Sequence, residues 1–492
     1  MNRPLKWYNF ITLNSYWLGL NISSGTITPV LLPYLVILFM PEELKNTYLA
    51  NVRVIGLAVA MLVQPIAGML SDRSQSRFGR RRPFILIGAV FSAIFVMLVG
   101  SSIFFVNSPL DGFFQGTLGV TTAYAVLLTG IVLLQVSSNI GHGALQGVIP
   151  DVVPENQRGK ASGVKAVFEL VPVFLVLFIG PLVSKGKVLE TAGIVAAGFI
   201  LTMLITLFFV KETPYQEPAS DSLREPIVRL IILTAIFVGA TQLAVWLVKT
   251  VGNAISSSTL EFATRVGLVG LLGLAAMTAA ILVGVYVGAW VGIGRDASQH
   301  KGFIWWVVGR LLFLAAVGSV QSFALYFLRD VIRIPDAPRM TTVLLAVVAL
   351  FLIPSALGGG ALADRFGQKR MVIWAGIVAA FGCFLLLFAR SMPLVLVSGC
   401  IIGLGTGTFM ATNWAMGTSL VPSKDAGKYL GISNLAGAGA GIIGVGIGGP
   451  MADFMNAVQP GLGYLVLFGI YAALFILSSL TLVIIQRYTV VR

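Results

Sequence analysis

The sequence predicts an all-α integral membrane protein with fourteen transmembrane helices: two six-helix halves and two inserted helices. Three observations predict this fold class. Of 492 residues, 57% are apolar and 11% are charged, whereas a soluble globular chain carries about 25% charged residues. The apolar residues fall in blocks long enough to cross a bilayer, which takes roughly 20 helical residues. A charged loop motif also occurs twice, which predicts a duplicated unit.

Proline, glycine and charge clusters mark the ends of the predicted helices. We place the N-terminal six-helix half in 1–210, a cytoplasmic linker with two inserted helices in 211–301, and the C-terminal six-helix half in 302–492. The predicted helices are 10–39, 48–71, 84–106, 119–149, 160–183, 188–210, 227–250, 262–294, 302–328, 340–362, 371–389, 394–421, 427–451 and 462–486.

The distribution of basic residues predicts the orientation of the chain. With both termini inside, the inside segments hold 21 of the 33 Lys and Arg residues, the outside loops hold 8, and 4 lie within predicted helices. This bias predicts a multi-pass protein of the plasma or bacterial inner membrane with both termini cytoplasmic. The basic residues form no continuous patch, so the net charge of +14 does not indicate nucleic-acid binding.

Motifs of soluble enzymes do not occur in a usable context. Cys383 and Cys400 both lie inside apolar blocks, which excludes a disulfide framework and a zinc site. The string Gly403-Leu-Gly405-Thr-Gly407 lies inside a predicted membrane helix with no preceding strand, so it is not a nucleotide site. We therefore expect no enzyme activity, no cofactor and no metal, and transport driven by a gradient rather than by ATP.

A loop motif follows the second helix of each predicted half. The first copy reads Gly68-Met-Leu-Ser-Asp72-Arg73 and continues to Gly79-Arg80-Arg81, and the second reads Gly360-Ala-Leu-Ala-Asp364-Arg365-Phe-Gly367. A second pair, Val153-Pro154 to Lys160 and Val421-Pro422 to Lys428, follows the fourth helix of each half. The chain is therefore predicted to be a duplicated six-helix unit.

The repeated loop predicts a gate at the cytoplasmic face. Gly68 and Gly360 would let neighbouring helices approach closely, and Gly79 and Gly367 would permit the turn. The two aspartates would face a helix N-terminus or a nearby arginine. Such contacts would close one face of a carrier, although the loops could instead only enforce topology. The predicted gate residues are Gly68, Asp72, Arg73, Gly79, Arg80, Arg81, Gly360, Asp364, Arg365 and Gly367.

These loops resemble the loop signature of the major facilitator superfamily. More narrowly, the stretch from Asp72 to Phe84 resembles the plant sucrose transporters and their animal relatives, which belong with the glycoside–cation symporters. Gly143 to Asp151 is similar to their fourth-helix segment, with Gln146 where those proteins usually carry arginine. The resemblance implies a carrier of sugars or glycosides, yet sugar carriers of that group have twelve helices and this chain inserts a further pair.

Polar residues inside predicted helices are candidates for substrate binding, because a carrier binds near the bilayer midplane. Amides, hydroxyls and aromatic faces suit a neutral polyol or an amphipathic organic molecule. The same residue types also join membrane helices when no ligand is present. The substrate-binding candidates are Tyr16, Trp17, Asn21, Asn139, Gln321, Tyr326, Asn413 and Trp414.

Four residues are candidates for proton coupling. Lys165 and Glu169 are four apart on one helix face, so Glu169 could carry a proton balanced by Lys165, or the two could form a permanent structural pair. Asp151 resembles a functional acid of the sucrose carriers, but it could instead cap its loop. His142 could titrate near neutral pH, or it could be a hydrogen-bonding side chain.

The predicted function is secondary transport of a small neutral solute, a sugar or glycoside, together with a proton. Export of a lipophilic compound is one alternative, and a non-transporting pigment-binding or assembly factor is another. The glycine-rich faces of the two inserted helices predict close packing on the core bundle, self-association or contact with a membrane partner.

Overall fold

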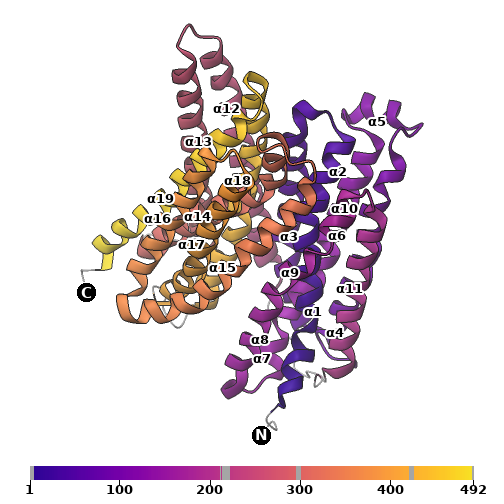
Figure 1. The fold of residues 1–492 in the computed structure, drawn as a ribbon. Helices are drawn as coiled ribbons and strands as arrows, with labels where there is room; N and C mark the ends of the chain where they lie inside the picture. Colours follow the sequence, from indigo (N-terminus) through magenta and orange to yellow (C-terminus); the bar gives the residue numbers. More distant parts are fainter. Residues whose placement is uncertain (1–4, 211, 213–221, 295–300, 420–425, 490–492) are drawn as a thin grey trace. The chain divides into compact units, whose positions relative to one another are not determined.

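The computed structural model describes residues 5–210, 212, 222–294, 301–419 and 426–489, and its regular elements in these ranges are all helical. Within the described residues, fourteen helical spans are long and apolar enough to cross a membrane, as predicted. The chain forms two compact units (Figure 1). Unit 1 comprises Met1–Met40 and Val59–Val228, and unit 2 comprises Pro41–Ala58 and Arg229–Arg492. The domain boundaries at 210 and 301 stay a prediction.

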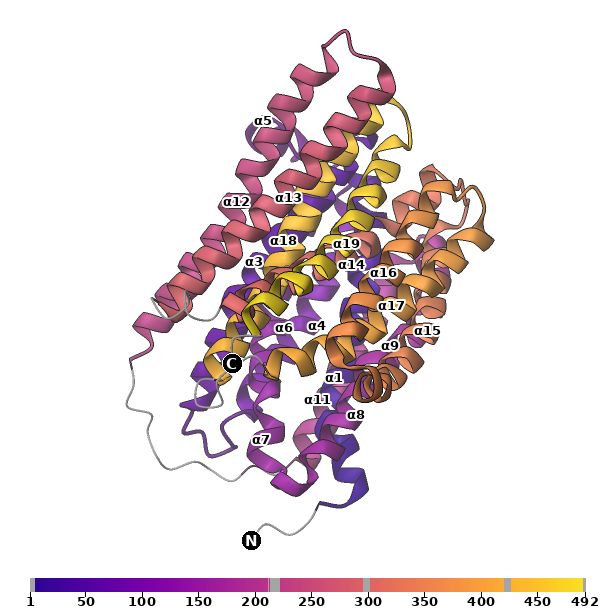
Figure 2. The ribbon, with the colours of Figure 1, turned by 90° about the vertical axis from the view of Figure 1, so that its left-hand side faces the viewer.

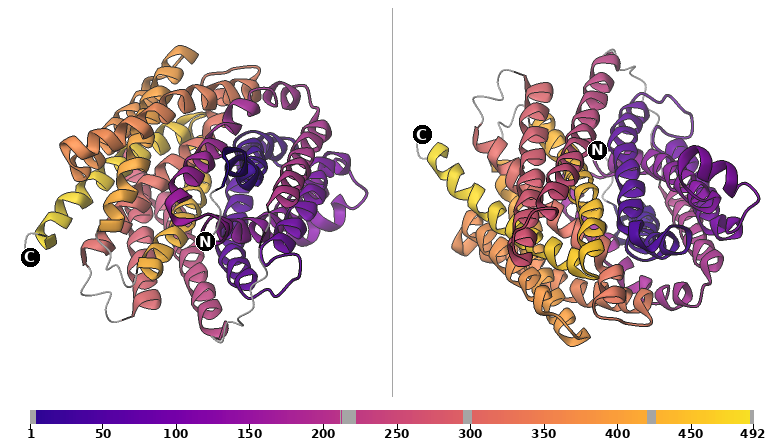
Figure 3. Two further views of the ribbon diagram at one scale, coloured as in Figure 1. Left: turned by 90° about the horizontal axis from the view of Figure 1, so that it is seen from below. Right: turned by 90° about the horizontal axis from the view of Figure 1, so that it is seen from above.

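Unit 1 holds the helices of the first six spans, which form a ring of coils when viewed from the two ends (Figure 3). The span before each loop motif is a single helix, whereas others are divided. The elements are α1 (Trp7–Thr26), the π-helical turn η1 (Ile27–Leu31), α2 (Leu32–Phe39), the later part of α3 (Lys45–Asp72), α4 (Arg82–Ser101), α5 (Asp111–Leu118), α6 (Thr122–Gln146), α7 (Val148–Val152), α8 (Arg158–Leu170), α9 (Pro172–Val176), α10 (Gly180–Ser184) and α11 (Val188–Phe209).

Prolines account for the divided spans. Proline lacks the N–H group of a helical hydrogen bond, and its ring clashes with the preceding turn. The first span is interrupted by the π-helical turn that contains Pro29. The fifth, predicted as one helix over 160–183, begins new segments at Pro172 and at Gly180, which precedes Pro181. These breaks place irregular backbone close to the polar residues of α1 and α8.

Unit 2 holds the inserted helices and the last six spans. Its elements are the beginning of α3, α12 (Arg224–Ser256), α13 (Phe262–Ile293), α14 (Lys301–Asp330), α15 (Ala337–Phe366), α16 (Gln368–Leu385), α17 (Met392–Ser419), α18 (Ala426–Val458) and α19 (Leu462–Thr489). The inserted pair forms a long hairpin beside α18 and α19 (Figure 2). A Cβ atom on Gly273 would come within 3.1 Å of Ile470, so this glycine permits the close packing that was predicted.

The packing of the second half repeats that of the first. In unit 1, α1 packs against α11 and α8, and α4 packs against α6 and α11. In unit 2, α14 packs against α19 and α18, and α16 packs against α17 and α19. These helices occupy corresponding places in the two series of six spans. The packing therefore supports the duplication inferred from the loop motifs.

Two sequence predictions need correction. The helix predicted at 427–451 continues to Val458, because Pro450 lies inside α18 instead of ending it. Gly360 was expected to permit close helix packing, but a Cβ atom there would meet nothing within 4 Å. Its neighbour Gly359 has that role, because a Cβ atom there would lie 3.1 Å from the Cα atom of Thr408. Residues 421–425 of the second repeated motif lie outside the described residues.

Candidate functional site

A polar cavity of about 300 Å³ lies within unit 1. Its walls come from α1, η1, α6, α8 and α11. Six of the predicted substrate-binding and coupling residues line it: Trp17, Asn21, Asn139, His142, Lys165 and Glu169. Further polar side chains in the wall include Ser23, Ser24, Thr28, Gln135, Ser138 and Gln146. The volume and the mixture of amides, hydroxyls and rings suit a small polar organic molecule.

Helical spacing explains why these residues share one cavity. Residues separated by three, four or seven positions lie on one face of an α-helix. On α1 this relation joins Trp17, Asn21 and Ser24, and on α8 it joins Lys165 and Glu169. The stripe on α6 consists of Gln135, Asn139, His142 and Gln146. Gln146, noted above only for the resemblance, therefore belongs to the cavity wall.

One cation and one anion face each other in the cavity. The Lys165 ammonium lies 3.1 Å from a Glu169 carboxylate oxygen, and both side chains are about one-third exposed. The same ammonium lies 4.2 Å from the centre of the Trp17 ring, within the range of a cation–π interaction. The His142 ring meets the Trp17 ring edge to face, with centroids 4.9 Å apart. Trp17 therefore joins the ion pair to the α6 wall.

Side-chain amides of the cavity are oriented by bonds to their own helices. Asn21 Nδ2 donates to the Trp17 carbonyl at 2.8 Å, and Asn139 Nδ2 donates to the carbonyl and to Oε1 of Gln135 at 2.8 and 3.0 Å. Such bonds limit the rotation of each amide, so less side-chain entropy is lost when a ligand binds.

Tyr16, a predicted substrate residue, does not line this cavity. Its side chain is fully buried, its ring lies 6.4 Å from that of Phe199, and its backbone N–H donates to Thr206 Oγ1 at 3.1 Å. Because α1 turns through about 100° per residue, Tyr16 points away from the face that carries Trp17. Tyr16 therefore packs α1 against α11.

The substrate candidates of unit 2 fall into separate places. Trp414 and Trp306 flank the Arg310 guanidinium, whose carbon lies 5.0 and 5.7 Å from the two ring centres. The buried Asn413 accepts a hydrogen bond at its backbone carbonyl from Trp306 Nε1 at 3.1 Å. Tyr326 is fully buried near the other end of α14, 5.4 Å from Lys45 Nζ, and Gln321 is half-buried on the same helix. Arg310 was not among the predicted substrate-binding residues.

The first loop motif folds into a charged group that we call the arginine cluster: Asp72, Arg80, Arg81, Asp151 and Glu212. Arg80 and Arg81 donate from Nε to Asp151 Oδ2 at 2.9 and 2.8 Å. Arg81 also forms an ion pair with Asp72, and its backbone N–H donates to Glu212 Oε2 at 2.8 Å. The hydrogen bonds from Arg80 to Asp151 raise the pKa of Arg80. Asp151, a predicted coupling residue, therefore lies with the predicted gate and not in the cavity.

Glycines allow this cluster to form. Gly79 has a φ of 101° and Gly367 a φ of 90°, as expected for the turn glycines of the two loops. Gly68 and Gly143 meet where α3 crosses α6, because a Cβ atom on Gly143 would lie 3.0 Å from Gly68 N. A Cβ atom on Gly147 would lie 2.6 Å from Arg81 Nε. Gly147 therefore leaves the space that the guanidinium occupies.

The second loop motif is more exposed than the first. Asp364 and Arg365 are both exposed at the end of α15, and the guanidinium carbon of Arg365 lies 5.4 Å from the centre of the Phe366 ring. Within the described residues no ion pair joins Asp364 to a basic side chain. Arg73 of the first motif is half-buried. The gate role of all these residues remains a prediction.

The raised pKa of Glu212 predicts that the free energy of unfolding depends on pH. Burial raises the pKa of Glu212, and the nearby Asp151 carboxylate adds to the rise. A carboxyl group whose pKa is higher in the folded state contributes stability below its unfolded pKa, and this contribution is lost as pH rises through the folded value. Relative to Glu212→Gln, the wild type should therefore lose stability as the pH rises above about 4, the pKa of an unfolded glutamate. Thermal unfolding in detergent at several pH values checks this, and parallel profiles would contradict it.

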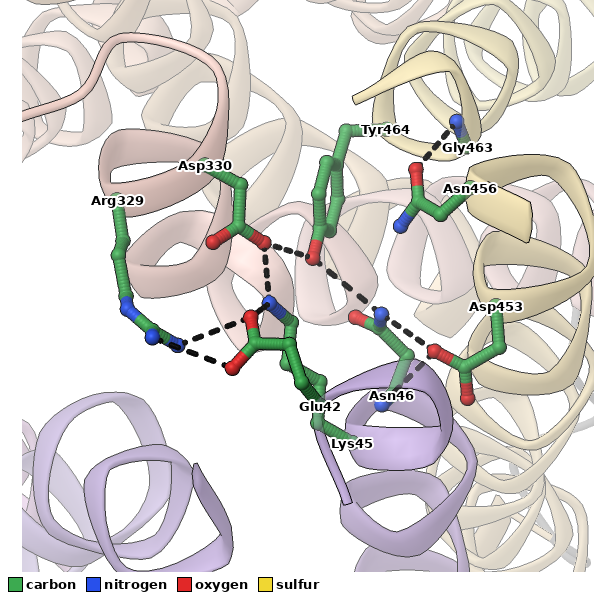
Figure 4. Close-up of polar contacts among 9 residues, drawn as sticks. All are labelled: Glu42, Lys45, Asn46, Arg329, Asp330, Asp453, Asn456, Gly463 and Tyr464. Atoms are coloured by element: carbon green, nitrogen blue, oxygen red, sulfur yellow. Dashed lines mark hydrogen bonds and ion pairs between the residues drawn. The ribbon is translucent and has the colours of Figure 1, made fainter. Parts of the chain in front are cut away.

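Sequence reasoning missed a second polar group, which we call the α3 docking cluster: Glu42, Lys45, Asn46, Arg329, Asp330, Asp453 and Tyr464 (Figure 4). It joins the beginning of α3 to the end of α14, to α18 and to the beginning of α19, all within unit 2. The predicted helices began at 48 and ended at 451, so Lys45 and Asp453 fell into loops. Lys45, a charged residue just before a predicted membrane helix, was the feature of the sequence that could have indicated this cluster.

Two series of six membrane-spanning helices with corresponding packing are the architecture of the major facilitator fold. Solved structures share this fold. A POT family transporter has a TM-score of 0.65 at 14% identity, over 98% of this chain and 96% of that one. A D-xylose-proton symporter has a TM-score of 0.60 at 17% identity, over 97% of each chain. The chain belongs to the MFS/sugar transport protein family, whose sequence profile matches residues 17–292 and 286–428.

Relatives of known name match shorter stretches. A sucrose transport protein of Arabidopsis thaliana is 28% identical over 181 residues, which cover 32% of this chain and 30% of the relative. The general alpha-glucoside permease of Schizosaccharomyces pombe is 28% identical over 188 residues, 37% of this chain and 33% of the relative. The matched part thus spans about a third of these relatives. The family is one of transport proteins, which agrees with the prediction that the chain is not an enzyme.

Proposed function

We propose that the chain is a secondary transporter that moves a small neutral sugar or glycoside together with a proton by alternating access. The observation that carries this proposal is the cavity of unit 1, where amides, hydroxyls and the Trp17 ring surround a single ion pair. Lys165 and Glu169 cancel in charge, so the site favours a neutral solute over an ion. Family membership supports the sugar class, and so does the similarity to a sucrose transport protein and an alpha-glucoside permease.

Glu169 is the proposed proton carrier. Its side chain is about 37% exposed and lines the cavity, so water can deliver a proton to it. A protonated Glu169 no longer balances Lys165, whose charge then rests only on the Trp17 ring and on polar neighbours. Protonation therefore changes the charge of the cavity by one unit. Binding of the proton can thereby shift the equilibrium between the two conformations of the transporter.

The same proposal includes the orientation of the chain in the membrane, the polar residues of unit 2 and the cytoplasmic gate. The excess of Lys and Arg in alternate loops supports cytoplasmic termini in a plasma or bacterial inner membrane. In unit 2, the Trp414 ring and the neighbouring Arg310 guanidinium are suited to a hydroxyl-rich ligand. The arginine cluster fits the proposed cytoplasmic gate, because a buried guanidinium shared by two carboxylates holds α3, α4 and α7 together.

Uptake by purified protein in liposomes tests the proposal. A labelled disaccharide should accumulate when the outside is acidified, and less without a pH gradient. In Glu169→Gln, uptake should lose its dependence on the gradient, because glutamine cannot carry a proton, while exchange of labelled for unlabelled sugar continues. Glu190→Gln is the matched control, since Glu190 also pairs with a lysine, Lys187, at 3.0 Å but outside the cavity.

Two outcomes would count against this proposal. Gradient-dependent uptake by Glu169→Gln would remove Glu169 from the coupling role. Failure to transport any disaccharide, combined with binding of lipophilic compounds or a stable membrane partner, would favour the exporter or the assembly factor instead.

A further inference from the structure

Gln242 places a side-chain amide deep within a membrane span. Arg229 and Lys249 bound the apolar part of α12, and residues 230–248 between them extend over about 29 Å, close to the thickness of the hydrocarbon core. Along the helix axis, Gln242 lies about 10 Å from Lys249 and about 20 Å from Arg229. A glutamine side chain cannot reach either membrane surface across these distances. Its amide therefore lies at the depth of the lipid tails.

The Gln242 amide has no hydrogen-bond partner in the part of the chain that the structure describes. Thr234 and Thr241, which lie in the same apolar part of α12, are buried and donate to the backbone carbonyls one turn earlier at 2.9 and 2.8 Å. Gln242, by contrast, is exposed, and no hydrogen bond joins it to a described residue. Lipid tails offer neither a donor nor an acceptor, so leaving an amide among them is costly. The amide therefore points to a partner outside this chain.

The exposed face of α12 is centred on this amide. Four residues spaced by three or four positions form one stripe along it, and all four are exposed: Ala235, Gly239, Gln242 and Trp246. A Cβ atom on Gly239 would meet nothing within 4 Å, so the backbone is open to a neighbouring helix. The opposite face is already covered, because Phe237 packs against glycines of α13 and α18. Figure 2 accordingly shows α12 at the edge of unit 2, with α13 beside it.

We propose that this face of α12 pairs with the same face of a second copy of the chain, and that the two Gln242 amides hydrogen-bond to each other. A side-chain amide carries both donors and an acceptor, so two amides related by a two-fold axis can exchange two N–H···O bonds. Lipid alone leaves the amide unpaired, and a different protein would need a polar side chain at the same depth. A second copy supplies that side chain by symmetry.

The neighbours of Gln242 suit such a contact. Gly239 and Ala235 carry little or no side chain, which lets two helix backbones approach closely enough for the amides to meet. The Trp246 ring is 60% exposed on the same stripe and adds contact area. The interface involves neither the cavity of unit 1 nor the arginine cluster, so the inference does not depend on the proposed substrate.

Oxidative cross-linking in membranes tests which face is in contact. Cys400 is first replaced by serine, and the remaining native Cys383 is fully buried. Gly239→Cys should then form covalent dimers on mild oxidation, because equivalent positions beside a two-fold axis come within reach of a disulfide. Phe381→Cys is the matched control and should stay monomeric, since Phe381 is 55% exposed on α16, another span of unit 2. Failure of Gly239→Cys to cross-link, or equal cross-linking at both positions, would overturn the proposed interface.

Association in liposomes tests the amide itself. Fluorescence energy transfer between labelled chains, measured over a range of protein-to-lipid ratios, gives the dissociation constant of the dimer. In Gln242→Leu this constant should rise about tenfold, because the variant keeps a side chain of similar size but loses the hydrogen bonds between the helices. Thr234→Val is the matched control and should associate like the wild type, since Thr234 is bonded within its own helix. A wild type that stays monomeric, or an unchanged constant in Gln242→Leu, would contradict the proposal.

Thermal unfolding in detergent separates dissociation from misfolding. Gln242 is exposed and unbonded within the described residues, so Gln242→Leu should melt at the wild-type temperature. Should it melt lower, Gln242→Asn decides, because it keeps an amide on a shorter side chain and should still raise the dissociation constant. An unchanged constant in that variant would overturn the proposal. Release of a different membrane protein by Gln242→Leu, from a chain that is itself monomeric, would show that the face binds that protein and that the second copy is wrong.

Discussion

Replacing Arg81 by alanine should lower the free energy of unfolding by about 3 kcal/mol, the lower end for breaking a buried ion pair. The Arg81 side chain is 6% exposed and Asp151 is 16% exposed, so the carboxylate would keep only Arg80 as a charged partner. The bond from Arg81 Nη1 to Ser71 Oγ, 2.6 Å long, would be lost as well. The pair with Asp72 adds little, because Asp72 is 53% exposed.

Unfolding in mixed micelles with a rising fraction of SDS measures this loss. Arg77→Ala is the matched control, because Arg77 lies in the same loop, is exposed and contacts the ring of Phe78. It should unfold within about 0.5 kcal/mol of the wild type. Equal losses of unfolding free energy in the two variants would mean that the arginine cluster stabilises the fold no more than any other charged residue of the loop.

Replacing Trp17 by alanine should reduce the efficiency of sugar uptake by at least about tenfold, which corresponds to ~1.4 kcal/mol. The Trp17 ring is both a wall of the cavity and the partner of Lys165 and His142. Its loss removes the flat apolar surface beside the amides and leaves the Lys165 charge less well held. Initial rates of labelled disaccharide uptake over a range of concentrations measure the effect.

Trp7→Ala separates the site from a general effect on α1. Trp7 lies on the same helix but is 73% exposed and outside the cavity. Its variant should transport like the wild type, and Trp17→Phe should fall between the two because it keeps a ring. Wild-type uptake by a folded Trp17→Ala protein would exclude Trp17 from substrate binding.

The parts of the fold that depend on local pattern could be predicted from sequence. Apolar blocks located the fourteen spans, and the four-residue spacing of Lys165 and Glu169 predicted a pair that the structure contains at 3.1 Å. Residues of α1 and α6 were candidates because they were polar inside apolar helices. Their convergence on one cavity depends on how the helices rotate about their axes, which no single helix determines.

Contacts between distant residues could not be predicted. Asn46 and Asp453 are 407 positions apart, and Arg80 and Asp151 are 71 apart. Asp453 also lay beyond the end of the helix predicted over 427–451, whereas α18 continues through Pro450 to Val458. Tyr16 was misplaced for a related reason, since composition identifies a polar residue in a helix but not the direction in which it points.

The sharing of α3 between two units has a mechanical consequence. A helix resists bending along most of its length, because each turn is tied to the next by hydrogen bonds. Pro65 lies inside α3, within the part that packs with unit 1, and its missing N–H removes one of those ties. A bend in α3 would therefore meet the least resistance at the turn that contains Pro65.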